Sequence, residues 1–239
     1  MVLPDVGNWK LSPDETSLGS FSLKYPFSCG WKSIGISAII AVFAAILIFP
    51  IIILWGFRYR MARAGARGDE SAPEFNDFGS IIKNGVLLVI AFLPYVLIVG
   101  VLTIVISGLG SLVSETFTGS ILFLWSLAAM YAGIAIHPTF VATGSIGKTY
   151  SGLLFVRVAA TREYLVGFLF GIVLRLLVGI AMLLLFIVSI ITVVGPFIVL
   201  AVWYAYDEFI AGAIWGHVAR SLAEKEALPT VKPDDSLDI

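Results

Sequence analysis

The sequence predicts an all-α integral membrane protein, a bundle of about five transmembrane helices with short interfacial helices on the cytoplasmic side. Hydrophobic residues make up 59% of the 239 residues and charged residues only 13%, and the mean hydropathy is +1.00. Soluble domains carry about a quarter charged residues. The apolar residues also come in long blocks, several of which reach the roughly 20 residues that a helix needs to cross a bilayer.

The composition divides the chain into three regions. Residues 1–32 are polar, and we expect a leader that is largely irregular up to residue 30. Residues 33–219 form the transmembrane helical domain, and 220–239 form a polar cytoplasmic tail. The expected spans are the long apolar blocks 33–57, 81–107, 120–142, 165–193 and 197–219.

The first block contains Pro50 and allows two topologies. Because proline removes a backbone donor and kinks a helix, 33–57 can form one kinked span. A hairpin broken at Pro50 is the alternative, and it would give six crossings. Its first arm, 34–49, would be only about 24 Å long at about 1.5 Å per residue, and the block contains no polar turn. Helix length therefore favours one kinked helix.

The connections between the blocks differ in charge and predict the orientation. The segments 58–80 and 143–164 and the tail carry many Lys and Arg, whereas 108–119 and 194–196 carry none. Cytoplasmic loops carry the basic excess, so we expect a multi-pass cell-membrane protein with a cytoplasmic C-terminus. Five spans place the leader outside, although its lysines disfavour that side; six spans would return it to the cytoplasm.

Two connecting segments contain features of their own. Residues 143–164 mix glycine, serine and basic residues with Leu and Phe, which is typical of a helix lying in the interface. In the segment 58–80, Asn76 or Asp77 can cap the second span by accepting a hydrogen bond from a free N–H at its start.

The block "GFRYRMARAGARGDESAPEFNDFGSIIKNG" (56–85) contains four arginines, a glycine after them and then Pro-x-Phe-x-Asp-x-Gly. It resembles the pattern of domain-of-unknown-function family 4013, a family of uncharacterised polytopic membrane proteins found mainly in archaea. "YPF" (25–27), "REYLVGFLFG" and "VVGPF" fit the same family, and the resemblance covers roughly 24–222. Phe78 stands where the family usually has Trp. The resemblance implies a fold and a compartment, and no activity.

Asp207 and Glu208 lie side by side within the last apolar block. A carboxylate at the centre of a membrane helix costs about 3 kcal/mol and usually faces the protein interior or a water cavity. Neighbouring residues on a helix point about 100° apart, so both cannot face one partner, and we expect at least one to be protonated. Two readings are open: a proton- or cation-linked site, or a neutral carboxyl bonded to Tyr204, Tyr206 or backbone.

Arg175 is the candidate counter-ion of this pair. From the turn at 195 it lies about 30 Å back along its helix, whereas Asp207 lies about 18 Å forward. The difference of about 12 Å exceeds what one arginine comfortably spans, so we expect Arg175 to extend toward the inner headgroups. A direct ion pair would need a shorter or tilted fourth helix.

Two small-residue motifs occur in the last two spans. Gly167 and Gly171 form one Gly-x-x-x-Gly pattern, and Gly212 and Gly216 form another. Such spacing lets helix backbones approach closely in lipid. We expect the two motifs to pack against each other, with a homodimer contact as the alternative.

The remaining polar residues match no catalytic or cofactor pattern. Cys29 is the single cysteine, and His137 and His217 have no second ligand at metal spacing, so we expect no metal and no cofactor. "ATGSIGKTY" has Ala142 where a phosphate-binding loop requires its first glycine. Four arginines follow the first block and are expected to set topology and to meet anionic lipid or a cytosolic partner: Arg58, Arg60, Arg63 and Arg67.

Three function classes follow from these patterns. The first is a non-enzymatic scaffold or accessory subunit of a membrane assembly. The second is a small-solute or ion transporter or channel that uses Asp207 and Glu208, and a membrane enzyme ranks third. The expected partner is the lipid bilayer, and a protein partner or a homo-oligomer stays open. Nucleic acid is not expected, because the net charge is only −1.

Overall fold

The computed structural model describes residues 17–44, 49–192 and 194–231, and the regular structure in these ranges is helical throughout. Five helical stretches within them are long and apolar enough to cross a membrane. They are Leu18–Phe43, Phe78–Ser111, Glu115–Thr143, Arg162–Ser189 and Gly195–Glu224. The predicted class, an all-α bundle with about five spans, is confirmed.

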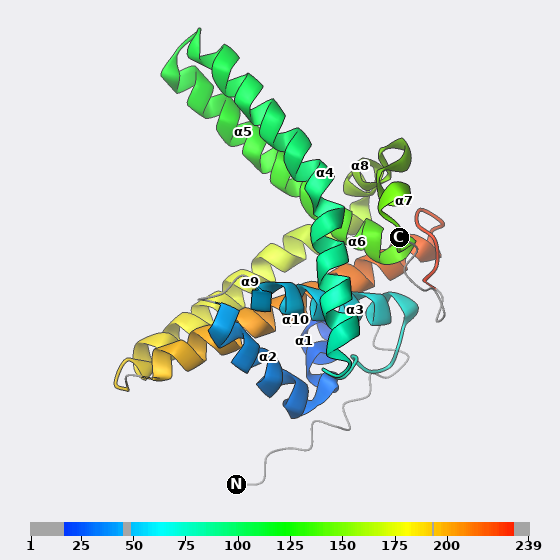
Figure 1. Ribbon diagram of the computed structural model, residues 1–239, viewed down its shortest axis with the longest axis vertical. Helices are drawn as coiled ribbons and strands as arrows, with labels where there is room; N and C mark the ends of the chain where they lie inside the picture. Colours follow the sequence, from blue (N-terminus) through cyan, green and yellow to red (C-terminus); the bar gives the residue numbers. More distant parts are fainter. Residues whose placement is uncertain (1–16, 45–48, 193, 232–239) are drawn as a thin grey trace.

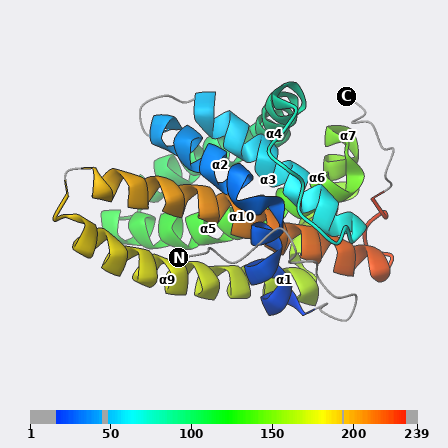
Figure 2. The same cartoon turned by 90° about the horizontal axis from the view of Figure 1, so that it is seen from below.

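The centre of the fold is α10 (Gly195–Glu224). It lies between α9 (Arg162–Ser189) on one side and α2 (Gly30–Ala44) with α3 (Phe49–Arg67) on the other (Figure 2). Its apolar faces bury Phe209 against Phe57 of α3, with ring centroids 5.1 Å apart. Since α10 has partners on opposite sides, side chains from several of its faces are buried.

Two helical hairpins extend from this centre in different directions (Figure 1). One pairs α4 (Phe78–Ser111) with α5 (Glu115–Ile134), and the other pairs α9 with α10. Figure 1 shows α4 changing direction near its middle, where Pro94 lies inside the helix and removes a backbone donor. In Figure 1 the α4–α5 turn lies at the upper left and the α9–α10 turn at the lower left, whereas α7 and α8 lie on the right.

Side-chain caps start three of the long helices, α4, α5 and α9. Ser114 Oγ accepts from Phe117 N at the start of α5, and Thr161 Oγ1 accepts from Tyr164 N at the start of α9. Asp77 Oδ1 accepts from Ser80 N, which confirms the cap expected before α4. Each cap satisfies a backbone donor that has no partner within its helix.

The expected third span and interfacial helix are divided into several helices. Ala135 separates α5 from α6 (Ile136–Thr143), which is buried along its length. The connection beyond it contains α7 (Ile146–Tyr150) and α8 (Leu154–Ala159) instead of one interfacial helix. Gly144 (φ 63°) ends α6 and Gly152 (φ 54°) precedes α8, and both lie in the left-handed region that favours glycine.

The single kinked span expected over 33–57 is wrong. The structure has two helices there, α2 and α3, and Pro50 lies in the first turn of α3. Ala41 and Leu54 share a buried cluster, although 13 residues of continuous helix would hold them about 20 Å apart. The two arms therefore pack against each other. Residues 45–48, which connect them, lie outside the described residues.

The expected boundaries of the leader and the tail also need correction. Leu18–Lys24 form helix α1, and a 3-10 helix follows at Tyr25–Cys29. Phe21 and Tyr25 are buried and stacked with ring centroids 4.4 Å apart, so this part is not irregular. At the other end, α10 continues to Glu224, and Leu228 is buried beyond it. Residues 1–16 and 232–239 lie outside the described ranges.

Two glycines allow α3 and α4 to approach closely. A Cβ atom added to Gly56 would lie 1.8 Å from Ile81 O, and one added to Gly85 would lie 2.0 Å from Ile52 O. Real Cβ atoms do not approach carbonyl oxygens so closely, so backbone contact requires glycine on both helices. This crossing connects the α4–α5 hairpin to the centre of the fold.

Candidate functional site

The first part of the site is a buried cluster around Glu208 of α10. Arg58 of α3 donates from Nη1 to Glu208 Oε2 at 3.0 Å and from Nε to His137 Nε2 at 3.1 Å. Only 7% of the Glu208 side chain and 15% of the Arg58 side chain are exposed. Trp55 lies against the guanidinium, with Cζ 5.8 Å from the ring centroid. The cluster joins α3, α6 and α10.

The second part is the ion pair between Asp207 of α10 and Arg175 of α9. Arg175 Nε lies 2.9 Å from Asp207 Oδ1. The Nε atom makes no hydrogen bond of acceptable geometry, so the contact is an ion pair by distance alone. The side chains are 37% and 32% exposed, respectively. This pair is therefore far more open than the Arg58–Glu208 pair.

The helical spacing explains why the two acids have different partners. Neighbouring residues on α10 point about 100° apart, so Asp207 faces α9 whereas Glu208 faces α3. We expected at least one carboxyl to be protonated, and a neutral carboxyl bonded to a tyrosine or backbone was one of the two readings. The structure places a separate arginine beside each of the two acids, so each has a partner of opposite charge.

The expectation that Arg175 extends away from Asp207 is wrong, and the helix ends explain why. Helix α9 ends at Ser189 and α10 begins at Gly195, so the turn starts earlier than expected. Counted from these ends, Arg175 lies about 21 Å back and Asp207 about 18 Å forward. A difference of about 3 Å is within reach of one arginine side chain.

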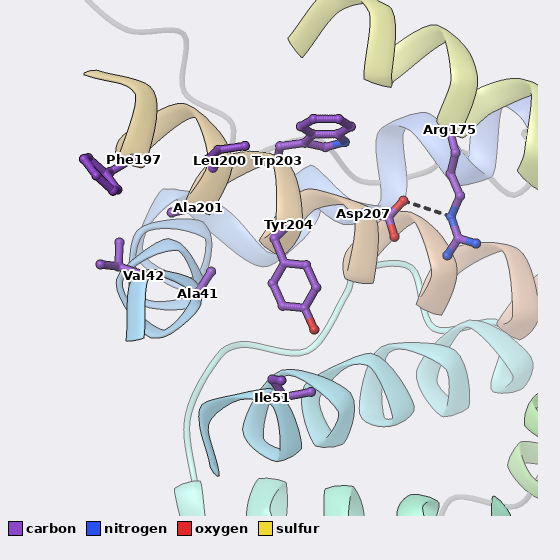
Figure 3. Close-up of a pocket in the computed structure, with 10 residues that line it drawn as sticks. All are labelled: Ala41, Val42, Ile51, Arg175, Phe197, Leu200, Ala201, Trp203, Tyr204 and Asp207. Carbon is purple, nitrogen blue, oxygen red and sulfur yellow. Dashed lines mark ion pairs between the residues drawn. The ribbon is translucent and has the colours of Figure 1, made fainter. Parts of the chain in front are cut away.

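A cavity of about 620 Å³ adjoins the Arg175–Asp207 pair. Helices α2, α3, α9 and α10 contribute its walls (Figure 3). Its described lining residues are two charged side chains, Arg175 and Asp207, and eight apolar or aromatic ones: Ala41, Val42, Ile51, Phe197, Leu200, Ala201, Trp203 and Tyr204. In Figure 3 the ion pair lies at one end and Phe197 at the other. The cavity thus has a charged end and an apolar end.

The four arginines of α3 do not form one exposed basic cluster. Arg58 points inward to Glu208, and Arg63 is buried. Arg60 donates to Asn76 O at 2.6 Å, and Arg67 donates to Asp69 Oδ2 at 2.6 Å. Burial lowers the pKa of Arg60, and Asp77 opposes this shift. Arg58 and Arg63 are therefore turned toward protein, whereas the contact of the exposed Arg67 with lipid or a cytosolic partner stays a prediction.

The two histidines have separate environments. His137 is 1% exposed and accepts from Arg58 at Nε2, which places the proton of a neutral ring on Nδ1. His217 lies beside Phe21, with ring centroids 5.6 Å apart. Among the described residues, no group of three His, Cys, Asp or Glu side chains is arranged to hold a metal ion.

The two Gly-x-x-x-Gly motifs lie at different helix contacts. Gly167 and Gly171 face Val218 and Ile214 of α10. Gly216 instead faces α3, where an added Cβ would lie 2.6 Å from Ala62 O, and Gly212 faces Arg58 O in the same way. The expected contact between the motifs is therefore wrong, because the second one packs on α3 and brings Arg58 close to α10.

The apolar residues that line the cavity were not predicted from the sequence. Trp203 and Tyr204 precede the acidic pair, and Ala41 belongs to a block expected to form a single span. Apolar residues of this kind are typical of any lipid-facing helix. The one available signal was a pair of acids in an apolar block, which indicated a polar interior surface nearby.

The fold and the paired charges define a multi-pass α-helical membrane protein whose interior holds two arginine–carboxylate pairs. The chain belongs to the DUF4013 family, a family of proteins of unknown function, which it matches over residues 39–205. The resemblance drawn from the block 56–85 is therefore confirmed. No curated protein and no solved structure matches the chain.

Proposed function

We propose that this protein is a non-enzymatic membrane protein that binds an apolar small molecule or lipid segment within its helical bundle and acts as an accessory subunit or scaffold. The observation that carries the proposal is the cavity between α2, α3, α9 and α10. Its volume of about 620 Å³ falls within the range of about 300–1,000 Å³ typical of ligand sites. Its lining is apolar apart from one ion pair, as expected for such a site.

The non-enzymatic part of the proposal is supported by the charges. Glu208 is held by Arg58, and Arg58 also donates to His137. A general base must reach the proton that it removes. Glu208 is buried where α10 packs on α3, and its carboxylate is paired with Arg58. We infer that this cluster stabilises the bundle.

Transport is the second candidate, and the openness of the Arg175–Asp207 pair favours it. About a third of each side chain is accessible, and both residues line the cavity. An ion or proton that reached the cavity could compete for Asp207. Under this candidate, Asp207→Asn abolishes a pH-dependent flux in reconstituted vesicles. An unchanged flux in Asp207→Asn and in Glu208→Gln would exclude it.

The binding proposal is tested by filling the cavity. Val42 lines it and is 41% exposed, so Val42→Trp adds volume at the cavity without crowding the buried core. The matched control is Val101→Trp on α4, where Val101 is exposed and away from the cavity. Native mass spectrometry of protein purified in a nonionic detergent measures co-purified apolar molecules.

The expected result is a bound molecule in the wild type and in Val101→Trp and its loss in Val42→Trp. Equal retention in all three proteins would show that the adduct lies elsewhere and would overturn the proposed function. A wild type without an adduct is then supplied with monoacylglycerol. Failure of monoacylglycerol to bind in a Val42-dependent way would also overturn it.

A further inference from the structure

The charged end of the cavity presents one positive and one negative group to whatever occupies it. Arg175 Nε and Asp207 Oδ1 are 2.9 Å apart, and each side chain is about one-third exposed. Both line the same cavity as Leu200 and Phe197. A ligand whose chain lies on the apolar walls would therefore place its head beside both charges (Figure 3).

The pair has hydrogen-bonding capacity left for a ligand. A guanidinium has five N–H donors, and a carboxylate has about four acceptor sites. Arg175 Nε is itself buried and makes no hydrogen bond despite its short distance to Asp207, so the capacity left for a ligand lies in the exposed parts of the two side chains. The Arg58–Glu208 pair differs, because Arg58 donates from two nitrogens in good geometry and Glu208 is buried. Of the two pairs, only Arg175–Asp207 is open to the cavity.

Charge balance selects the class of head group. A head with a single charge would engage one member of the pair and leave the other without its partner, which is costly in a poorly hydrated site. A head that carries both charges can engage both members. Resting on the proposed function, we propose that the cavity binds a single-chain zwitterionic amphiphile, with its anionic group at Arg175 and its ammonium at Asp207.

The experiment compares four probes whose hydrocarbon chains have the same length. They are lysophosphatidylethanolamine as the zwitterion, lysophosphatidylglycerol as the anion, a long-chain alkylammonium as the cation and a monoacylglycerol as the neutral molecule. Occupancy is measured by native mass spectrometry on the full chain in a nonionic detergent. Wild type is expected to bind the zwitterion at least about tenfold more tightly than the other probes, because each charged probe leaves one member of the pair without a partner and the neutral probe supplies no charge to either member.

Single substitutions should shift the preference in opposite directions. Asp207→Asn leaves Arg175 without its anion and is expected to favour the anionic probe. Arg175→Gln is expected to favour the cationic probe. Loss of folding cannot produce such opposite shifts. The matched control is Arg220→Gln, which removes the cation of the Arg220–Glu224 pair at the end of α10 away from the cavity, and it should keep the wild-type preference.

The outcomes separate the two proposals. If all four probes bind equally and Val42→Trp abolishes their binding, the inference of a zwitterionic ligand is overturned, but the cavity remains a binding site. A wild-type preference for the anionic, cationic or neutral probe would also overturn the inference of a zwitterionic ligand. Binding of every probe that Val42→Trp leaves unchanged would overturn the proposed function itself. Zwitterion preference together with opposite shifts in the two variants supports the inference.

Discussion

Arg58 donates a hydrogen bond of 3.0 Å to Glu208 and joins two helices whose paired residues are 150 positions apart in the chain. The carboxylate lies in α10, which is apolar enough to cross a membrane, whereas α3 is not among the candidate spans. Helix α3 carries four arginines, including Arg58. Pairing with Glu208 compensates a charge that would otherwise be costly to bury, so the ion pair and the α3–α10 contact depend on each other.

Glu208→Gln should destabilise the protein far more than Asp207→Asn. The first change leaves the buried Arg58 without its anion, which costs about 3 kcal/mol or more. The second affects a pair that is one-third exposed, where the cost of leaving the arginine without its anion is smaller than at the buried pair. Unfolding by sodium dodecyl sulfate in detergent micelles, followed by circular dichroism, measures the difference. Equal losses would contradict the different environments of the two acids.

The Arg58–Glu208 interaction should appear as a coupling energy in a double-mutant cycle. Arg58→Met, Glu208→Leu and their combination complete the cycle. The double variant should be more stable than the sum of the single losses by about 1–3 kcal/mol, because neither charge remains unpaired. His137 loses its donor Arg58 in the two proteins that carry Arg58→Met, so this loss is the same on both sides of the cycle. An additive result would mean that the pair contributes no mutual stabilisation.

Gly56→Ala and Gly85→Ala should each prevent normal packing of α3 on α4. The added Cβ would lie within 2.0 Å of a backbone carbonyl oxygen, and backbone cannot yield as a side chain does. We expect a loss of at least about 3 kcal/mol or no folded protein. Gly100→Ala on the same α4 helix is the control, since no atom lies within 4 Å of its added Cβ. It should be neutral or stabilising by up to about 1 kcal/mol, as size-exclusion profiles after heating can measure.

The two Gly-x-x-x-Gly motifs should respond differently to alanine. At Gly216 the new Cβ would lie 2.6 Å from Ala62 O, whereas at Gly171 it would lie 3.5 Å from Ile214 Cδ1, an ordinary contact. Gly216→Ala should therefore lower the midpoint of thermal unfolding in detergent, and Gly171→Ala should change it little. If Gly171→Ala proved the more damaging, the assignment of the second motif to α3 would be wrong.

Cys29 should react slowly with a membrane-impermeant maleimide on either side of the membrane until the protein is denatured. The thiol is 4% exposed, and its S–H donates to Pro26 O at 3.0 Å. Orientation needs introduced thiols in a Cys29→Ala background. Val113→Cys and Lys148→Cys lie at exposed positions on either side of the span Glu115–Thr143.

The basic connections predict that Val113→Cys is labelled on intact cells and Lys148→Cys only after lysis. The reverse pattern would place the C-terminus outside. Labelling of both thiols on intact cells would contradict a crossing between them.

Several features of the fold could be read from the chain alone. The long apolar blocks predicted the candidate spans, and Asp77 was one of two predicted caps of α4. Blocks of this length have few alternatives in lipid, because backbone groups must bond within a helix. The first block was misassigned, since a hairpin there needs α10 to cover both arms and local sequence does not contain that partner.

In the candidate site, too, some features could be predicted from the sequence and others could not. The sequence identified Asp207 and Glu208 as unusual, and their neighbouring positions indicated that they face different ways. It did not assign Arg58 to Glu208, because four arginines in one segment look like a cytoplasmic cluster. A displacement of the α9–α10 turn by a few residues also decided whether Arg175 meets Asp207.

The amino-acid sequence alone predicts a helical membrane protein with costly charges inside its apolar segments, because the bilayer acts on each segment separately through length and polarity. The packing of the helices was needed to show which arginine pairs with which acid and that a cavity lies beside one of the two pairs. Each residue shifts a side chain by about 1.5 Å along a helix and about 100° around it. Such pairings therefore depend on helix ends and contacts that no single segment contains.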